Sequence, residues 1–254
     1  MASHVETRGG PLSAEHRFFM ISAWVMAAVI VAGFSTNLVL GRSSFAMPPI
    51  FHVHAFVFFG WLVLYLTQTS LIAGGNVALH RRLGWLTLGW VPAMVVLGTA
   101  MTITSVRRFG GPPFFDANEF LFQNIVGIFV FAGMVGAAIV MRRRTDWHRR
   151  LMYCAMASIT GPGLGRILPM PLFIPWAWWV VQGVAGLFMV VAMILDRRRT
   201  GRIHPAWLWG IGIFFGSQIV CDLVAYSPWG LSITHDVLGP SNSRTDLHAH
   251  FPHG

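Results

Sequence analysis

Long apolar runs separated by short arginine-rich segments are the feature that most constrains what this chain can fold into. Seven runs carry at most one Asp, Glu or Arg each, and they approach or exceed the ~20 residues that a helix needs to cross a bilayer. Charged residues make up 11% of the chain, against ~25% in a typical soluble domain, which excludes a soluble enzyme. We therefore predict an all-α bundle of seven transmembrane helices, at residues 18–40, 50–73, 84–106, 120–141, 151–167, 172–195 and 206–226.

The fifth run is the shortest and contains the segment GPGLG at 161–165. A helix broken at membrane depth is tolerated where protein or a water-filled cavity surrounds the break. The spacing of Gly161 and Gly165 fits close helix packing equally well. We expect a broken fifth helix, with a cavity and simple packing as alternatives. The membrane domain then covers 18–226, between an N-terminal segment at 1–17 and a poorly ordered tail at 227–254.

Arginines are distributed unevenly between the two sides of the predicted bundle. The chain has no lysine, and 13 of its 18 arginines fall in the N-terminal segment and in the loops after the second, fourth and sixth spans. Because positive residues collect on the cytoplasmic side, we predict a cytoplasmic N-terminus and an external C-terminus. This orientation is opposite to that of rhodopsins and G-protein-coupled receptors. The absence of lysine independently excludes a retinal Schiff base.

The strong positive charge has the same explanation. A net charge of +9 would suit nucleic acid, but arginines beside apolar runs are what membrane orientation produces. We expect no nucleic-acid partner. The expected partners are the lipid bilayer, acidic phospholipids at the arginine loops, and other subunits of a membrane complex.

A repeated tetrapeptide marks the predicted cytoplasmic face. The sequence HRRL occurs at 80–83 and again at 148–151, and His204 opens the last span in a similar setting. This pattern places His80, His148 and His204 at three helix N-termini, where the positive helix end keeps imidazole neutral. Neutral imidazoles could bind haem iron or a metal ion, and the arginines could bind an anion. The alternative is that these side chains only contact phospholipid headgroups.

A second polar cluster is predicted near the external face. His52 and His54 follow two prolines at the start of the second span, and they could share a metal ion only if the backbone there is not yet helical. Asp222 is the expected third ligand or proton acceptor, with Glu119 as a second candidate. Arg166 could belong to this catalytic group or form a purely structural ion pair with Asp222.

Polar and aromatic residues on one face of the second span indicate that the interior of the bundle is partly polar. His54, Trp61, Tyr65 and Gln68 recur at helical spacing, so this face should look into the bundle rather than at lipid.

Three short segments carry a resemblance to known proteins. The stretch HVHA at 52–55, WLVLYLTQ at 61–68 and LHRRLGW at 79–85, with a later WHRRLM at 147–152, resembles a group of bacterial polytopic inner-membrane proteins without a settled function. The resemblance implies a bacterial inner-membrane protein and no particular activity. Membrane cytochromes b also place histidines at helix ends. This chain departs from them because it lacks a histidine pair inside two spans at matching depth.

Three functional hypotheses remain open. The first is metal- or haem-dependent redox chemistry on a quinone or lipid. The second is a carrier or lipid-handling protein that uses the broken helix and a polar cavity without chemistry. The third is a structural or assembly subunit of a larger membrane complex. No phosphate-binding glycine loop, zincin motif or serine elbow favours a soluble-enzyme chemistry.

Overall fold

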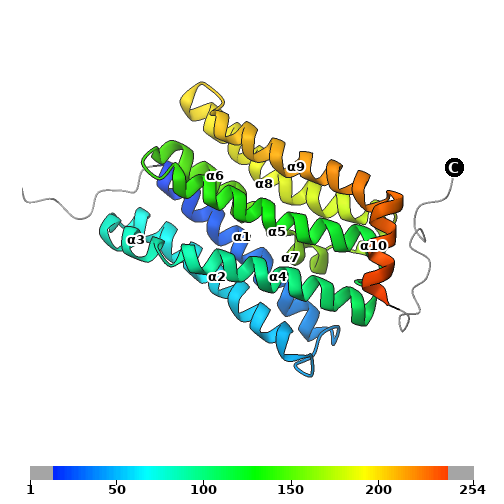
Figure 1. Cartoon of the computed structure of the whole chain (residues 1–254). Coiled ribbons are helices and arrows are strands. Elements are labelled where there is room, and N and C mark those ends of the chain that lie inside the picture. The colour runs from blue at the N-terminus through cyan, green and yellow to red at the C-terminus, as the bar shows by residue number, and fades with distance from the viewer. Residues whose placement is uncertain (1–13, 240–254) are drawn as a thin grey trace, which may run out of the picture.

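Long helices packed side by side form the bundle in the computed structural model, which describes residues 14–239 (Figure 1). Within that range the chain is helical and has no strand, and six helices are long and apolar enough to cross a membrane. The protein is therefore a multi-pass, all-helical membrane protein. The six helices are α1 (Ala14–Val39), α2 (Pro49–Ala73), α4 (Thr87–Phe109), α5 (Ala117–Val140), α8 (Ala177–Thr200) and α9 (Pro205–Ala225).

The predicted fifth span is divided between two shorter helices. Helix α6 (Thr145–Ser158) ends just before helix α7 (Gly161–Ile167) begins, with Pro162 in the first turn of α7. Proline lacks the N–H that a continuous helix would bond to the carbonyl four residues earlier, so one straight helix is interrupted here. Neither segment alone reaches the length of a span. In the described residues the structure thus shows six single-helix spans where the sequence predicts seven.

Helices α6 and α7 follow α1 in the same direction. Near the start of α1, Arg149 of α6 pairs with Glu15 at 2.8 Å. Farther along, Gly163 of α7 meets Gly33 of α1 backbone to backbone. A Cβ atom on Gly33 would overlap the carbonyl oxygen of Gly163, and one on Gly163 would lie 2.7 Å from the Cα of Ile30. The glycine-rich segment therefore serves close helix packing, through Gly163 rather than through the Gly161/Gly165 pair.

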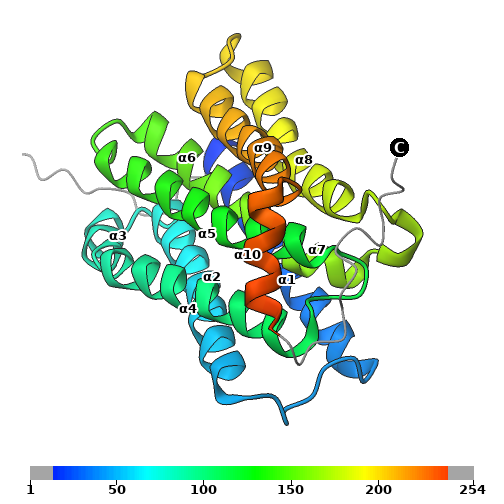
Figure 2. The ribbon, with the colours of Figure 1, turned by 45° about the vertical axis from the view of Figure 1, so that its right-hand side comes forward.

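The shorter helices mark the two ends of the bundle. Helix α3 (Val77–Gly84) connects α2 and α4 at one end, which we call the α3 end. Helix α10 (Pro228–Leu238) packs against α4, α5 and α9 at the opposite end, which we call the α10 end (Figure 2). A single 3-10 turn, η1 (Met170–Phe173), joins α7 to α8.

Helix α10 corrects the expectation of a poorly ordered tail from residue 227. Ser227 caps the helix by accepting a hydrogen bond from the N–H of Gly230, and proline occupies the first helical position. Leu238 packs with Val106 and Leu121 in a small apolar cluster. The polar composition of the tail hides this helix because the polar residues are concentrated after Leu238. Residues 240–254 lie outside the described part of the chain.

The polar and aromatic stripe on α2 faces the bundle, as the helical spacing predicts. Trp61 is 1% exposed and Tyr65 is 5% exposed. Trp61 packs edge-on against Phe131 of α5, with ring centroids 5.2 Å apart. Gln68 lies at the α3 end, where its side-chain amide faces His80.

The contact between Gly33 and Gly163 gives a direct test of the α1–α7 packing. We expect Gly163→Ala to lower the free energy of unfolding by ~1–3 kcal/mol, because the new methyl group meets backbone that cannot rotate away. Gly183→Ala in α8 is the matched control, since no atom lies within 4 Å of its Cβ position. Thermal unfolding in detergent measures both variants. Equal stability of the two would contradict the close contact.

Candidate functional site

His52 and His54 do not converge on one point. Both lie in the first turns of α2, and residues two apart on a helix point about 200° apart. The Nε2 atom of His52 hydrogen-bonds the carbonyl oxygens of Phe45 and Met47, each at 3.1 Å. The ring of His54 instead stacks on Phe58, with centroids 4.0 Å apart. The condition for a shared metal ion, a non-helical backbone at this point, is not met.

Asp222 is held by neutral donors on other helices. Its carboxylate accepts hydrogen bonds from Nε2 of Gln123 at 2.6 Å and from Nε1 of Trp179 at 2.7 Å. Helix α9, which carries Asp222, packs against α5, α6, α8 and α10 but not against α2. The expected metal site of His52, His54 and Asp222 is therefore not assembled. Within residues 14–239, no group of three or more His, Cys, Asp or Glu side chains could hold a metal ion.

Two further carboxylates lie near Asp222 at the α10 end. Glu119 is 2% exposed and Asp116 is 3% exposed, and Glu119 lies within electrostatic reach of both Asp116 and Asp222. Asp116 accepts a hydrogen bond from the hydroxyl of Tyr226 at 2.8 Å. We call Asp116, Glu119 and Asp222 the acid cluster. The sequence analysis named Glu119 and Asp222 but missed Asp116, although its position three residues before Glu119 is a helix-start signal.

Three predicted histidines do gather at the α3 end. The rings of His80 and His148 lie 6.3 Å apart, and Nδ1 of His148 donates to the carbonyl oxygen of Ala138 at 2.8 Å. His204 caps α9 and hydrogen-bonds Asp146 through Nε2 at 2.8 Å. These histidines are therefore bonded to protein groups. They are not arranged as a set of three ligands.

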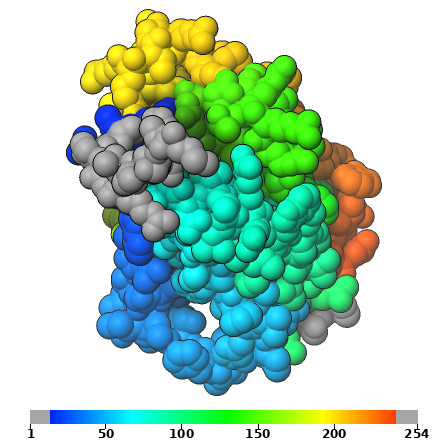
Figure 3. Space-filling view, turned by 90° about the vertical axis from the view of Figure 1, so that its left-hand side faces the viewer, coloured from blue at the N-terminus to red at the C-terminus, as the bar shows by residue number. Residues whose placement is uncertain are grey.

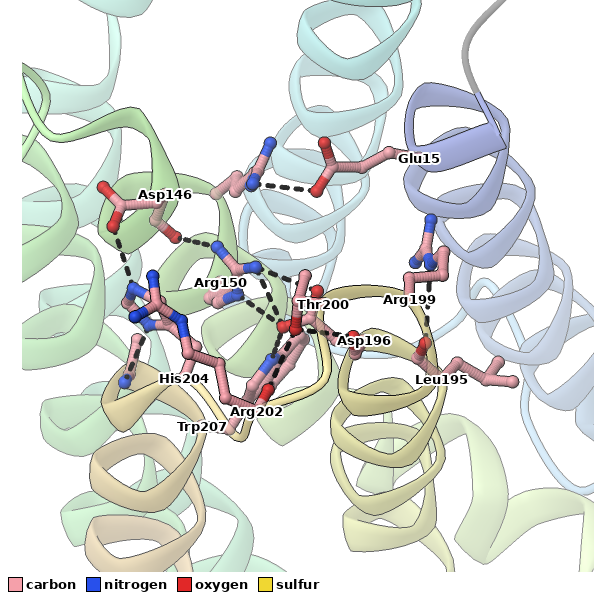
Figure 4. A network of polar contacts seen from close by, with 12 residues as sticks. Glu15, Asp146, Arg150, Leu195, Asp196, Arg199, Thr200, Arg202, His204 and Trp207 are labelled. Carbon is pink, nitrogen blue, oxygen red and sulfur yellow. Dashed lines mark hydrogen bonds and ion pairs between the residues drawn. The ribbon is translucent and has the colours of Figure 1, made fainter.

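The same end contains a fully buried ion pair that connects three helices (Figure 4). Arg150 of α6 binds both carboxylate oxygens of Asp196 of α8, each at 2.9 Å. Trp207 of α9 donates its indole N–H to the same carboxylate at 2.8 Å. Arg150 and Asp196 are each 2% exposed. The sequence analysis expected Arg150 to bind an anion or to contact phospholipid headgroups. It missed Asp196, which directly follows the apolar run at 172–195.

The surroundings shift two pKa values at this end. Burial, together with the neighbouring His148 and the charge of Arg81, lowers the pKa of His80. This keeps the imidazole neutral at pH 7. Burial alone would raise the pKa of Asp146, but the hydrogen bond from His204, the hydrogen bonds from backbone N–H groups and the charge of His204 together lower that pKa.

Arg166 has an unusual environment in α7. Its guanidinium carbon lies 4.0 Å from the centre of the Phe34 ring on α1, and Nη1 donates to the carbonyl oxygen of Pro162 at 2.6 Å. The Nε atom is buried and has no hydrogen-bond partner. The expected ion pair with Asp222 is not formed, and in the described part of the chain no carboxylate pairs with Arg166.

His54 lies within electrostatic reach of Arg166 and, like it, has one buried nitrogen without a hydrogen bond. The ring of His54 hydrogen-bonds the backbone of Leu97 in α4, and its Nδ1 atom is buried without a hydrogen bond. Phe34 and Phe59 pack edge-on beside Arg166, with centroids 5.4 Å apart. We call Arg166, His54 and the adjacent rings of Phe34, Phe58 and Phe59 the Arg166–His54 site.

An opening in the molecular surface lies on the same side of the bundle. Figure 3 shows it between the last turns of α1 and the first turns of α2. Phe34 belongs to the one helix end, and His54 to the other.

Comparisons of the chain with protein-family models, with curated proteins and with solved structures find no match. The function is therefore argued from the geometry of the described residues.

The buried Arg150–Asp196 pair predicts that replacing Asp196 destabilises the protein much more than replacing Glu15 does. Asp196→Asn leaves a buried arginine without its counter-ion, which should lower the free energy of unfolding by ~3–5 kcal/mol. Glu15→Gln removes the partner of Arg149, where both side chains are about one-third exposed, and should cost ~0–1 kcal/mol. Denaturant unfolding in detergent measures both variants. A small, equal loss would show that Asp196 has no structural role.

Proposed function

We propose that this protein is a carrier or lipid-handling protein of the bacterial inner membrane, and that the Arg166–His54 site binds its ligand. The cation of Arg166 carries the proposal, because no carboxylate within residues 14–239 neutralises it. Arg150, the other arginine inside the bundle that we describe, is neutralised by Asp196. This difference between the two arginines supports the view that the charge of Arg166 serves to bind a ligand.

Unpaired polar atoms inside a membrane protein are costly. A charged or hydrogen-bonding group that loses water without gaining a partner destabilises the fold, so such groups usually have a functional reason. Arg166 of α7 and His54 of α2 each keep a buried nitrogen without a partner. A ligand that reaches both nitrogens would remove this cost.

The break between α6 and α7 supports the same site. Because α7 is a separate short helix, its position beside α1 is set by the Gly33–Gly163 contact. Phe34 directly follows Gly33, and Arg166 lies one turn after Gly163. The close contact therefore places the guanidinium over the ring of Phe34.

The proposal includes a topology. Together α6 and α7 complete a seventh crossing parallel to α1, so the two termini lie on opposite sides of the membrane. The excess of arginines on the side of the N-terminus makes the N-terminus cytoplasmic and the C-terminus external. The α3 end then faces the cytoplasm, where its exposed arginines contact acidic phospholipids. In this orientation the Arg166–His54 site lies in the external half of the membrane.

Redox chemistry receives less support than ligand binding. A metal site needs donors that converge, and the histidines pair with carbonyl oxygens and a carboxylate instead. In the acid cluster, Asp222 is bonded to Gln123 and Trp179, and Asp116 is bonded to Tyr226, which suits helix packing.

Reporter fusions test the proposed orientation. An enzyme that is active only outside the cytoplasm should be active when fused after Gly254, because α9 ends on the external side. The same enzyme inserted after Arg143, in the turn between α5 and α6, should be silent. Activity in the second position alone would reverse the topology.

Ligand retention tests the proposed function. After purification in mild detergent, we expect Arg166→Gln to retain ~10- to 100-fold less of the co-purified lipid-soluble molecule, as loss of a hydrogen bond to a charged group implies. Arg143→Gln removes an exposed arginine and should retain the same amount as the natural chain. Organic extraction followed by mass spectrometry measures the ligand. The proposal fails if both variants match the natural chain.

A further inference from the structure

We infer that Glu119 is a reversible proton-binding site at the α10 end of the bundle. At neutral pH its carboxyl group holds a proton, while the neighbouring Asp222 is ionised. Release of this proton adds a second negative charge between α5 and α9 and weakens their contact. The proton site is separate from the Arg166–His54 site, so it stands whether or not that site binds a ligand.

Hydrogen bonds on both sides fix the position of Glu119 between α5 and α9. Gln123, one turn after Glu119 on α5, donates from Nε2 to the carboxylate of Asp222 on α9 at 2.6 Å. Asp116, which directly precedes α5, accepts a hydrogen bond from the hydroxyl of Tyr226 at 2.8 Å. Because residues three and four apart share one helix face, Glu119 faces α9 at the level between Asp222 and Tyr226. Its carboxyl group is within electrostatic reach of both.

The carboxyl group of Glu119 differs from that of Asp222 because it receives no donor. Glu119 is 2% exposed and, in the part of the chain that the structure describes, it forms no hydrogen bond and no ion pair. Asp222 accepts two N–H groups, from Gln123 and Trp179, and these donors stabilise its ionised form. A buried carboxylate without a donor or a cation is neutralised by a proton instead. The proton therefore binds Glu119 rather than Asp222.

The elements packed against α5 leave a charge on Glu119 uncompensated. Helix α9 contributes Asp222, Tyr226 and the thiol of Cys221, none of which is a cation. The charged residues of α6 lie in its first two turns, at the α3 end. Helices α4 and α10 contribute exposed titratable side chains at the α10 end, namely Arg107, Arg108, His235 and Asp236. Within residues 14–239 none of these groups forms an ion pair with Glu119. The positive end of α5 favours a charge on Glu119, but this effect is small beside the cost of burying a carboxylate without a donor.

A second polar atom at the start of α5 also lacks a partner. Asn118 is 0% exposed, and its Nδ2 atom donates to the carbonyl oxygen of Ala225 at 3.0 Å. Its Oδ1 atom is buried without a hydrogen bond. Buried polar atoms in native proteins are usually satisfied, so two unsatisfied side chains in one helical turn support a binding role for this turn. The turn lies at the end of its helix, which brings Glu119 close to the membrane surface.

Carbodiimide labelling tests which carboxyl group holds the proton. Dicyclohexylcarbodiimide is lipid-soluble and reacts with protonated carboxyl groups but not with ionised ones. Purified protein in detergent is treated with it, and mass spectrometry of the peptides locates the label. At about pH 7 we expect at least ~10-fold more label on Glu119 than on Asp222 or on the partly exposed Glu15, and less label on Glu119 as the pH rises.

The pH dependence of stability gives a second test that needs no reagent. If the folded chain holds a proton that the unfolded chain releases, the folded protein loses stability as the pH rises from about 5 to about 9, above the ordinary titration range of glutamate. Glu119→Gln cannot ionise, so its unfolding midpoint should fall less over this range and should exceed that of the natural chain at about pH 9. Glu15→Gln is the matched control, and its midpoint should follow the same profile as the natural chain.

Each possible outcome supports or overturns the proton site. Label on Asp222 in place of Glu119 would show that the other carboxyl group holds the proton, and Glu119 would not be the site. A Glu119 that stays unlabelled from about pH 5 to about pH 9 would also overturn the inference. So would identical pH profiles of the natural chain and Glu119→Gln, because Glu119 would then be ionised in the folded protein. The labelling uses the natural chain, so it decides the question if Glu119→Gln does not fold.

Discussion

The interior of a membrane-spanning bundle contains little water, so a polar side chain there needs a partner from the protein itself. At the α3 end, the carboxylate of Asp196 receives Arg150 and Trp207 and thereby connects α6, α8 and α9. At the α10 end, Asp222 receives Gln123 and Trp179 and connects α5, α8 and α9. The half of the bundle made of α5, α6, α8 and α9 is thus held together by hydrogen bonds between side chains at both ends.

The other half, made of α1, α2, α4 and α7, depends on close packing instead. Gly33 and Gly163 bring α1 and α7 into backbone contact, and the ring of Trp90 on α4 lies in the space over Gly60 of α2. Trp90 adds one hydrogen bond, from Nε1 to the carbonyl oxygen of Val57 at 2.8 Å. Arg166 and its unpaired nitrogen lie in this half. The site proposed for the ligand is therefore separated from the polar ties that stabilise the rest of the bundle.

Sequence reasoning predicted the helical membrane fold because apolar runs report directly on the solvent of each helix. It also predicted the buried face of α2 and the gathering of histidines at the α3 end. It could not predict partners, because these depend on which helices pack together. Asp222 and Arg166 looked like a pair in the sequence, but the structure places Asp222 against Gln123 and Trp179. Arg150 was expected to bind an anion or a lipid headgroup because Asp196, its partner, lies on a different helix. The helix at 228–238 was not predicted because the polar composition of the whole tail is a stronger signal than the serine and proline at the start of one short helix.

The two halves of the bundle differ in the interactions that hold their helices together, and this difference affects how a ligand would reach the site. Separating α9 from α5 or α8 would break charge-assisted hydrogen bonds at Asp222, each worth ~1.5–3 kcal/mol. At Phe34 and Phe59, α1 and α2 are instead held by contact between two aromatic rings. Local opening follows the regions with the weakest interactions. We therefore expect the proposed ligand to enter from lipid on the α1–α2 side, where Arg166 contacts Phe34 and, within the described residues, has no carboxylate partner.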